Sequence, residues 1–181
     1  RKRGLYPASG KARLGRKGGA AVIAVTVIAL GKLKERSMRE LCAEYEKRLS
    51  AFCRLQIVEL TPERLSERPS ANEIARALDT EAAHITSKIP ANAYVFAMCI
   101  EGKQMPSEAF SQKLSFLSVN GVSNVVFLLG SSFGLQEALK KQADFRFSMS
   151  EMTFPHQLAR VMLLEQIYRA FQIESGGKYH K

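Results

Sequence analysis

Short apolar runs rich in β-branched residues alternate along the chain with longer stretches in which apolar residues recur every three or four positions. Runs of the first kind are typical of buried strands, and stretches of the second kind are typical of helices that pack on a sheet. The pattern predicts strands at 22–30, 54–60, 93–100, 124–129 and 145–147, and helices at 37–49, 71–87, 107–118, 135–142 and 156–173. Because strands and helices alternate, we expect an α/β domain with a largely parallel sheet flanked by helices.

The helix expected at 156–173 is apolar around most of its circumference. Such a helix must be buried on several sides, and we expect one side to face a second subunit; burial wholly within one chain is the alternative. Glu165 and Arg169 are four residues apart and are predicted to pair along this helix. Arg160 has no partner at that spacing and is a candidate for contact with a phosphate or with the surroundings of a ligand.

The net charge of +10 is concentrated at the start of the chain. The first 20 residues contain seven basic and no acidic residues, which leaves 20 basic and 17 acidic residues for the other 161. Total charge is therefore weak evidence about partners. We expect 1–21 to be a basic flexible leader or a remnant of cloning, and 22–181 to be one domain. A secretory signal is the alternative, but the β-branched run that follows is typical of a core strand, and no small-residue cleavage pattern comes after it.

The remaining composition excludes several classes of protein. No run reaches 18 consecutive apolar residues, so we expect no membrane span. Cys42, Cys53 and Cys99 are odd in number and widely separated, and no Cys-x-x-Cys pair occurs. We therefore expect neither a disulfide framework nor a metal site, and we expect buried thiols in a reducing compartment.

Two segments have compositions that fit a ligand site. The strand expected at 124–129 runs into Gly-Ser-Ser-Phe-Gly at 130–134, and glycines at the carboxyl end of a parallel strand let the backbone approach a ligand. By itself this sequence favours an ordinary strand-to-helix turn over a ligand loop, since it is neither a phosphate-loop motif nor a dinucleotide-binding motif. The segment 149–156 has small, sulfur-bearing and hydroxyl side chains that could line an adenine pocket. The alternative is a helix start capped by Thr153, with His156 solvated.

The chain ends in two glycines followed by Lys178, Tyr179, His180 and Lys181. An aromatic ring can stack on a nucleic-acid base while cations meet phosphate, and a histidine can exchange protons near neutral pH. The alternative is a frayed, solvated terminus.

In combination and order, these motifs resemble the RlmH family of SPOUT methyltransferases. The resemblance covers 25–49 and runs almost continuously across 94–181. Its most specific parts are Glu101-Gly102-Lys103, the loop 130–134, Phe154-Pro155-His156, Glu165 with Tyr168-Arg169-Ala170, and the terminal Tyr179-His180-Lys181.

The resemblance implies an α/β SPOUT fold with a C-terminal trefoil knot, a homodimer in the cytoplasm, S-adenosylmethionine as cofactor and no metal. It implies methylation of N3 of a pseudouridine in helix 69 of 23S ribosomal RNA, within the assembled ribosome. A methyltransferase of the same fold acting on another RNA such as transfer RNA, or a non-catalytic protein that binds RNA or ribosomes, are the alternatives.

The family's residue roles can be transferred only where the motifs match. Its cofactor contacts match Met98, Gly130, Met149, Ser150, Glu151, Met152, Thr153 and Phe154. His180 is expected to position or deprotonate the base, Lys181 to stabilise the anion, and Tyr179 to pack against the target nucleotide. His156 and Arg160 are expected to support the cofactor loop or to bind RNA phosphate. The family usually has a second glycine in place of Ser131 and a smaller or acidic residue in place of Phe133, so this loop is predicted to be narrower.

Overall fold

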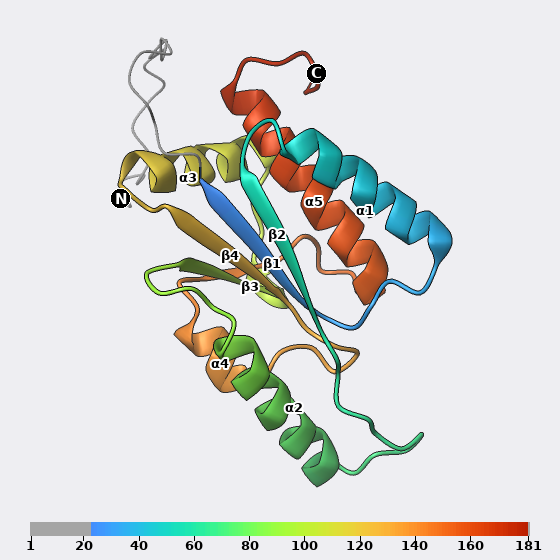
Figure 1. Ribbon diagram of the computed structural model, residues 1–181. Helices are drawn as coiled ribbons and strands as arrows, with labels where there is room; N and C mark the ends of the chain where they lie inside the picture. Colours follow the sequence, from blue (N-terminus) through green and yellow to red (C-terminus); the bar gives the residue numbers. More distant parts are fainter. Residues whose placement is uncertain (1–22, 181) are drawn as a thin grey trace.

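A five-stranded parallel sheet forms the centre of the computed structural model, which describes residues 23–180 (Figure 1). Its strands are β1 (Ala24–Leu30), β2 (Arg54–Leu60), β3 (Tyr94–Lys103), β4 (Asn124–Leu129) and β5 (Phe145–Phe147), in the order β2-β1-β4-β3-β5. The helices are α1 (Arg36–Leu49), α2 (Ala71–Thr86), α3 (Ser107–Val119), α4 (Glu137–Gln142) and α5 (His156–Glu174). Every strand pair is parallel, as the alternation of strands and helices predicts.

Helices cover both faces of the sheet, with α1, α3 and α5 on one face and α2 and α4 on the other (Figure 1). Strand β1 shows the division, because Val25 and Val27 pack in the core beneath the first group while Ile28 and Leu30 pack in the core beneath the second. A strand buried on both faces is apolar at nearly every position, which is why its sequence is a continuous β-branched run.

The predicted elements are all present, and the deviations are at their ends. Strand β3 continues to Lys103, beyond an irregularity in which Met98 and Lys103 both pair with Phe147. Helix α4 begins at Glu137 because the side chain of Gln136 accepts a hydrogen bond from the backbone N–H of Leu139. The leader predicted at 1–21 lies outside the described residues. Strand order and register do not describe a knot, which stays a prediction from the resemblance.

Hydrogen bonds between α3 and α5 set the register of these two helices. Ser107 donates to Gln166, Ser111 to the carbonyl of Ala170 and Ser115 to Glu174, over distances of 2.6 to 2.7 Å. Both sets of positions advance by four residues in the same direction, so the two helices run parallel. Helix α5 is thereby buried between the sheet, α1 and α3 within one chain. Its expected contact with a second subunit stays a prediction.

The cysteines are free thiols, with Cys42 and Cys53 buried and Cys99 half-buried. Burial raises the pKa of Cys42 to about 11 and that of Cys53 to about 12. Both groups are therefore uncharged and unreactive near neutral pH. Among residues 23–180, no helix is both long and apolar enough to cross a membrane, and no cluster of three potential metal ligands occurs.

Candidate functional site

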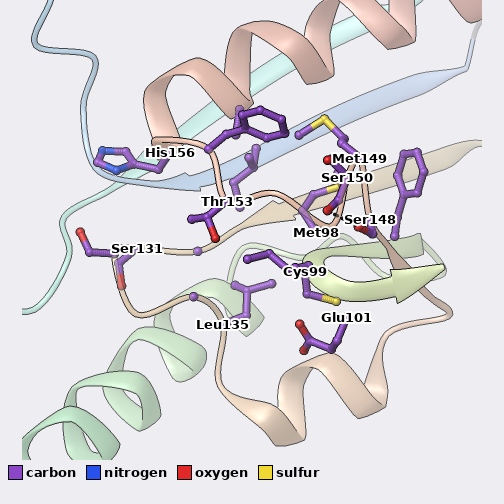
Figure 2. A pocket seen from close by; sticks show the side chains of 18 of the residues that line it. Met98, Cys99, Glu101, Ser131, Leu135, Ser148, Met149, Ser150, Thr153 and His156 are labelled. Atoms are coloured by element: carbon purple, nitrogen blue, oxygen red, sulfur yellow. Dashed lines mark hydrogen bonds between the residues drawn. The ribbon is translucent and has the colours of Figure 1, made fainter. Parts of the chain in front are cut away.

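A pocket of about 930 Å³ opens at the carboxyl edge of the sheet (Figure 2). Its walls come from the end of β3, the loop 130–134 that follows β4, and the segment 147–156 between β5 and α5. In a parallel sheet this edge collects the loops of neighbouring strands, so segments far apart in the sequence meet there. Both segments that composition singled out as ligand loops are therefore parts of one cavity.

The loop 130–134 is a tight turn that requires glycine at both ends. A Cβ atom on Gly130 would lie 2.3 Å from the backbone of Gly134, which is far inside van der Waals contact. Gly134 has a φ of 79°, in the left-handed region that disfavours other residues, and its N–H donates to the carbonyl of Ser131 at 2.9 Å. The glycines are thus needed for the loop's own closure, a reason that the sequence pattern alone did not supply.

The segment that leads into α5 is held by the extension of β3. The N–H of Ser148 donates to the carbonyl of Lys103 at 3.2 Å, and the Ser148 hydroxyl donates to the carbonyl of Ser150 at 2.8 Å. The N-cap of α5 is Pro155, and no side chain caps the helix. The alternative in which Thr153 caps it is therefore wrong, and Thr153 lines the pocket. The backbone N–H groups of Thr153 and Phe154 donate to no residue within 23–180.

Most of the expected cofactor residues line this pocket together. The lining includes Met98, Gly130, Met149, Ser150, Met152, Thr153 and Phe154, with His156 at its edge. Glu151 is exposed and is not part of the lining. The lining also includes residues that were not expected from the sequence: Leu129 and Leu135, which flank the glycine loop, and Cys99, Glu101 and Lys140. The flanking leucines could have been found from their position at a strand end, whereas no local pattern marks Lys140.

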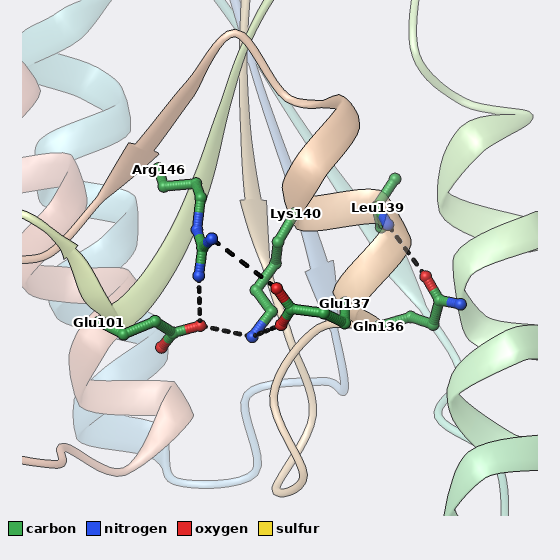
Figure 3. A network of polar contacts seen from close by, with 6 residues as sticks. All are labelled: Glu101, Gln136, Glu137, Leu139, Lys140 and Arg146. Atoms are coloured by element: carbon green, nitrogen blue, oxygen red, sulfur yellow. Dashed lines mark hydrogen bonds and ion pairs between the residues drawn. The ribbon is translucent and has the colours of Figure 1, made fainter.

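A charged network closes the side of the pocket formed by β3, α4 and β5 (Figure 3). Lys140 pairs with both Glu101 and Glu137, and Arg146 contacts the same two carboxylates at 3.1 and 3.7 Å. The hydrogen bond from Lys140 is the main reason that the pKa of Glu101 falls to about 2. Two acids and two bases thus stay ionised and balance one another, which fixes α4 to the two strands without adding net charge.

Arg160 joins the start of α5 to the ends of two strands. Its side chain is 2% exposed, and it donates to the Glu59 carboxylate of β2 and to the carbonyl of Gly31 after β1, each at 2.5 Å. This burial does not agree with direct contact between Arg160 and an RNA phosphate, whereas it fits the supporting role. The ion-pair partner of Arg160 is Glu59, which is 101 residues away in the sequence and therefore could not be predicted from helical spacing.

His156 packs against the turn that Arg160 holds. Gly31 has a φ of 96°, and a Cβ atom there would lie 3.5 Å from Nε2 of His156. Burial, followed by the charges of Arg160 and Lys34, lowers the pKa of His156. The imidazole at the edge of the pocket is therefore neutral at pH 7, so it is a hydrogen-bonding group there and not a cation.

The C-terminal residues are docked on α5 and not in the pocket. Tyr179 packs edge-on against Tyr168 with ring centroids 4.9 Å apart, and its hydroxyl donates to Glu165 at 3.2 Å. His180 contacts Glu108 at 2.9 Å and Arg169 at 3.3 Å. The predicted pair of Glu165 and Arg169 is confirmed at 2.5 Å. Lys181 lies outside the described residues.

Helix α5 separates this tail from the pocket of the same chain. His156 begins the helix at the pocket and Glu174 ends it, so the two are about 27 Å apart at 1.5 Å per residue. The tail folds back along this helix, and its contacts lie at Glu165 and Arg169, about 14 and 20 Å along the axis from His156. The structure thus brings most of the expected cofactor residues together and keeps the expected catalytic tail of the same chain apart from them.

Comparisons with known proteins identify the family of this chain. A family model described as predicted SPOUT methyltransferase matches residues 23–180. A ribosomal RNA large subunit methyltransferase H from Leuconostoc mesenteroides is 47% identical over 87% of this chain and 99% of its own length. Proteins of the same name from Streptococcus suis and Streptococcus agalactiae are 46% and 44% identical, over 87% and 86% of this chain and 99% and 98% of their own lengths. The chain therefore belongs to the SPOUT methyltransferase family, in the group of the large-subunit ribosomal RNA methyltransferases H.

Proposed function

We propose that this methyltransferase transfers the sulfonium methyl group of S-adenosylmethionine to N3 of a pseudouridine in helix 69 of 23S ribosomal RNA, in the cytoplasm and on the assembled ribosome. The observation that carries the proposal is the pocket at the carboxyl edge of the sheet, in which the glycine loop and the segment before α5 form facing walls. The relatives that match nearly the whole domain are named for methylation of large-subunit ribosomal RNA.

The residues of the pocket fit S-adenosylmethionine. A volume of about 930 Å³ is within the range of cofactor sites, and the lining combines methionine, leucine and phenylalanine side chains with backbone groups. The backbone N–H groups of Thr153 and Phe154, which donate to no residue within 23–180, can donate to the acceptor nitrogens of an adenine ring. When bound, the cofactor supplies an electrophilic methyl group. The protein's part is to hold the two reacting atoms close and aligned, which a rigid pocket does without a metal.

The acceptor nitrogen of the base must lose its proton, and the C-terminal tail has the groups to assist. In this proposal the imidazole of His180 accepts that proton or orients the base, Lys181 stabilises the resulting anion, and Tyr179 packs against the nucleotide. In the single chain His180 contacts Glu108 and Arg169, so it must leave these partners to act.

The docked position of the tail supports a homodimer in which each tail serves the pocket of the other subunit. The tail packs on the middle of α5, at Glu165, Tyr168 and Arg169, and does not enter the pocket of its own chain. A second copy related by a two-fold axis can bring its tail to the first pocket, and the reverse contact then forms by symmetry.

The cofactor assignment is tested by calorimetric titration of the purified protein with S-adenosylmethionine and with its demethylated product. We expect saturable binding with a fixed stoichiometry per chain. The RNA target is tested by incubating the protein with ribosomes from cells that lack the modification and mapping the methylated nucleotide. Absence of binding by folded protein would exclude the methyltransferase mechanism, and a product in transfer RNA would replace the proposed substrate.

The crossed arrangement is tested by mixing two inactive variants. His180→Ala removes the tail's imidazole, and Gly130→Ala deforms the pocket loop. If the tail acts on the partner's pocket, a mixed dimer keeps one complete site, and a random mixture recovers about a quarter of wild-type activity. If pocket and tail of the same chain act together, the mixture stays inactive. Each variant is first checked for folding and dimerisation.

A further inference from the structure

A buried carboxyl group lies behind the glycine loop, on the side away from α5. It belongs to Glu81 of α2, which is 3% exposed. One oxygen accepts the hydroxyl of Ser131 at 3.0 Å, and the other accepts the backbone N–H of Glu63 at 2.9 Å. These partners are 50 and 18 residues away, so this one side chain joins α2, the glycine loop and the segment after β2.

The glycine loop is a thin wall between two cavities. One side faces the large pocket, and the other faces a cavity of about 130 Å³ whose lining includes Glu63, Glu81, Ser131 and Phe133. The backbone–backbone hydrogen bond within the loop, from Gly134 to Ser131, closes the turn but does not fix its position relative to the sheet. An anchor outside the loop is needed to hold this wall in place.

The bond from Ser131 supplies that anchor. A carboxyl group that is nearly removed from water is costly unless its oxygens accept hydrogen bonds, so Glu81 strongly favours the loop position that keeps Ser131 in reach. The Ser131 hydroxyl is directed toward α2 by this bond and does not extend across the large pocket.

We propose that Glu81 is a positioning residue for the cofactor, which acts through Ser131 to hold the glycine loop in its binding shape. The inference rests on the proposed cofactor site. A loop held in place loses less conformational freedom on binding, so the effect is on cofactor affinity. Glu81 itself does not line the large pocket, and it makes no direct contact with a ligand there.

The test measures the dissociation constant for S-adenosylmethionine by calorimetry in Glu81→Leu, Ser131→Ala and the double variant; leucine at 81 has no group that can bond to Ser131. We expect each single change to weaken binding by about tenfold, because one hydrogen bond to a buried carboxyl group is lost. Since both changes remove the same bond, the double variant is expected to bind about as weakly as either single variant. Ser131→Thr keeps the hydroxyl and is expected to restore affinity.

Ser111→Ala is the matched control. Its side chain is more deeply buried than that of Ser131, and its hydroxyl donates to the carbonyl of Ala170 at 2.6 Å between α3 and α5, away from the pocket. We expect it to lower the thermal midpoint and leave cofactor affinity unchanged. The inference is overturned if Ser131→Ala binds as wild type does, or if Ser111→Ala loses as much affinity. Failure of the wild-type protein to bind would overturn the proposed function, and this inference with it. If Glu81→Leu does not fold, the affinity of Ser131→Ala tests the inference by itself.

Discussion

The ion pair between Arg160 and Glu59 tests how much a buried charge near the pocket changes the free energy of unfolding, because the two side chains differ in burial. The Arg160 side chain is 2% exposed and that of Glu59 is 33% exposed. Glu59→Ala leaves a buried positive charge that retains the carbonyl of Gly31 as a partner. Arg160→Met leaves a carboxylate that can reach water and fills much of the vacated volume with an apolar chain.

These differences give an order of magnitude for each change. An uncompensated buried charge costs about 3 kcal/mol, which is the expected loss of unfolding free energy in Glu59→Ala. In Arg160→Met the lost attraction is small because Glu59 is partly solvated, and the main cost is the unpaired carbonyl of Gly31, about 1 to 2 kcal/mol. We therefore expect Glu59→Ala to be the more destabilising single change, and the double variant to be more stable than Glu59→Ala alone.

The assay is equilibrium unfolding in urea at fixed protein concentration, because the apparent stability of the proposed homodimer would depend on concentration. If the unfolding free energy depends equally steeply on urea concentration in all variants, the substitutions change stability and not the surface exposed on unfolding. The reasoning would be refuted if Arg160→Met cost more than Glu59→Ala, or if the double variant were the least stable. Either result would mean that the attraction between the charges outweighs the cost of burying them.

Other measurements test the electrostatics of the site. By NMR titration His156 should show a pKa below its ordinary value, and Arg160→Met should raise it by removing a neighbouring charge; no rise would contradict this cause. Because the unfolded chain binds that proton more readily, His156 should reduce stability as pH falls below the ordinary histidine pKa. Lys32 and Lys34 are exposed beside the turn that contacts His156. Reversing both charges should lower kcat/KM on ribosomes by about tenfold and make kcat/KM less dependent on salt. The affinity for the cofactor should stay unchanged. Cys99 lines the pocket, and it should react with iodoacetamide before the two buried thiols and be protected by S-adenosylmethionine; equal rates would refute this.

Local periodicity in the sequence determined the elements of this fold and one of its ion pairs. Continuous β-branched runs mark strands buried on both faces, and the three-to-four spacing of apolar residues marks the helices between them. The pairing of Glu165 with Arg169 follows from the same helical geometry and needs no tertiary information. Composition alone favoured a plain turn and a helix start for the two pocket segments, and only the family resemblance indicated a ligand site.

Tertiary structure alone decided which partner each buried polar group meets. The strand order β2-β1-β4-β3-β5 places Glu59 beside Arg160 and brings α2 behind the glycine loop, so that Glu81 reaches Ser131. It also decided that Tyr179 docks on the middle of α5 and not in the pocket. Hydrophobic periodicity specifies which face of an element is buried, but not which distant element covers that face. The partners of buried charges are therefore fixed only when the layers pack.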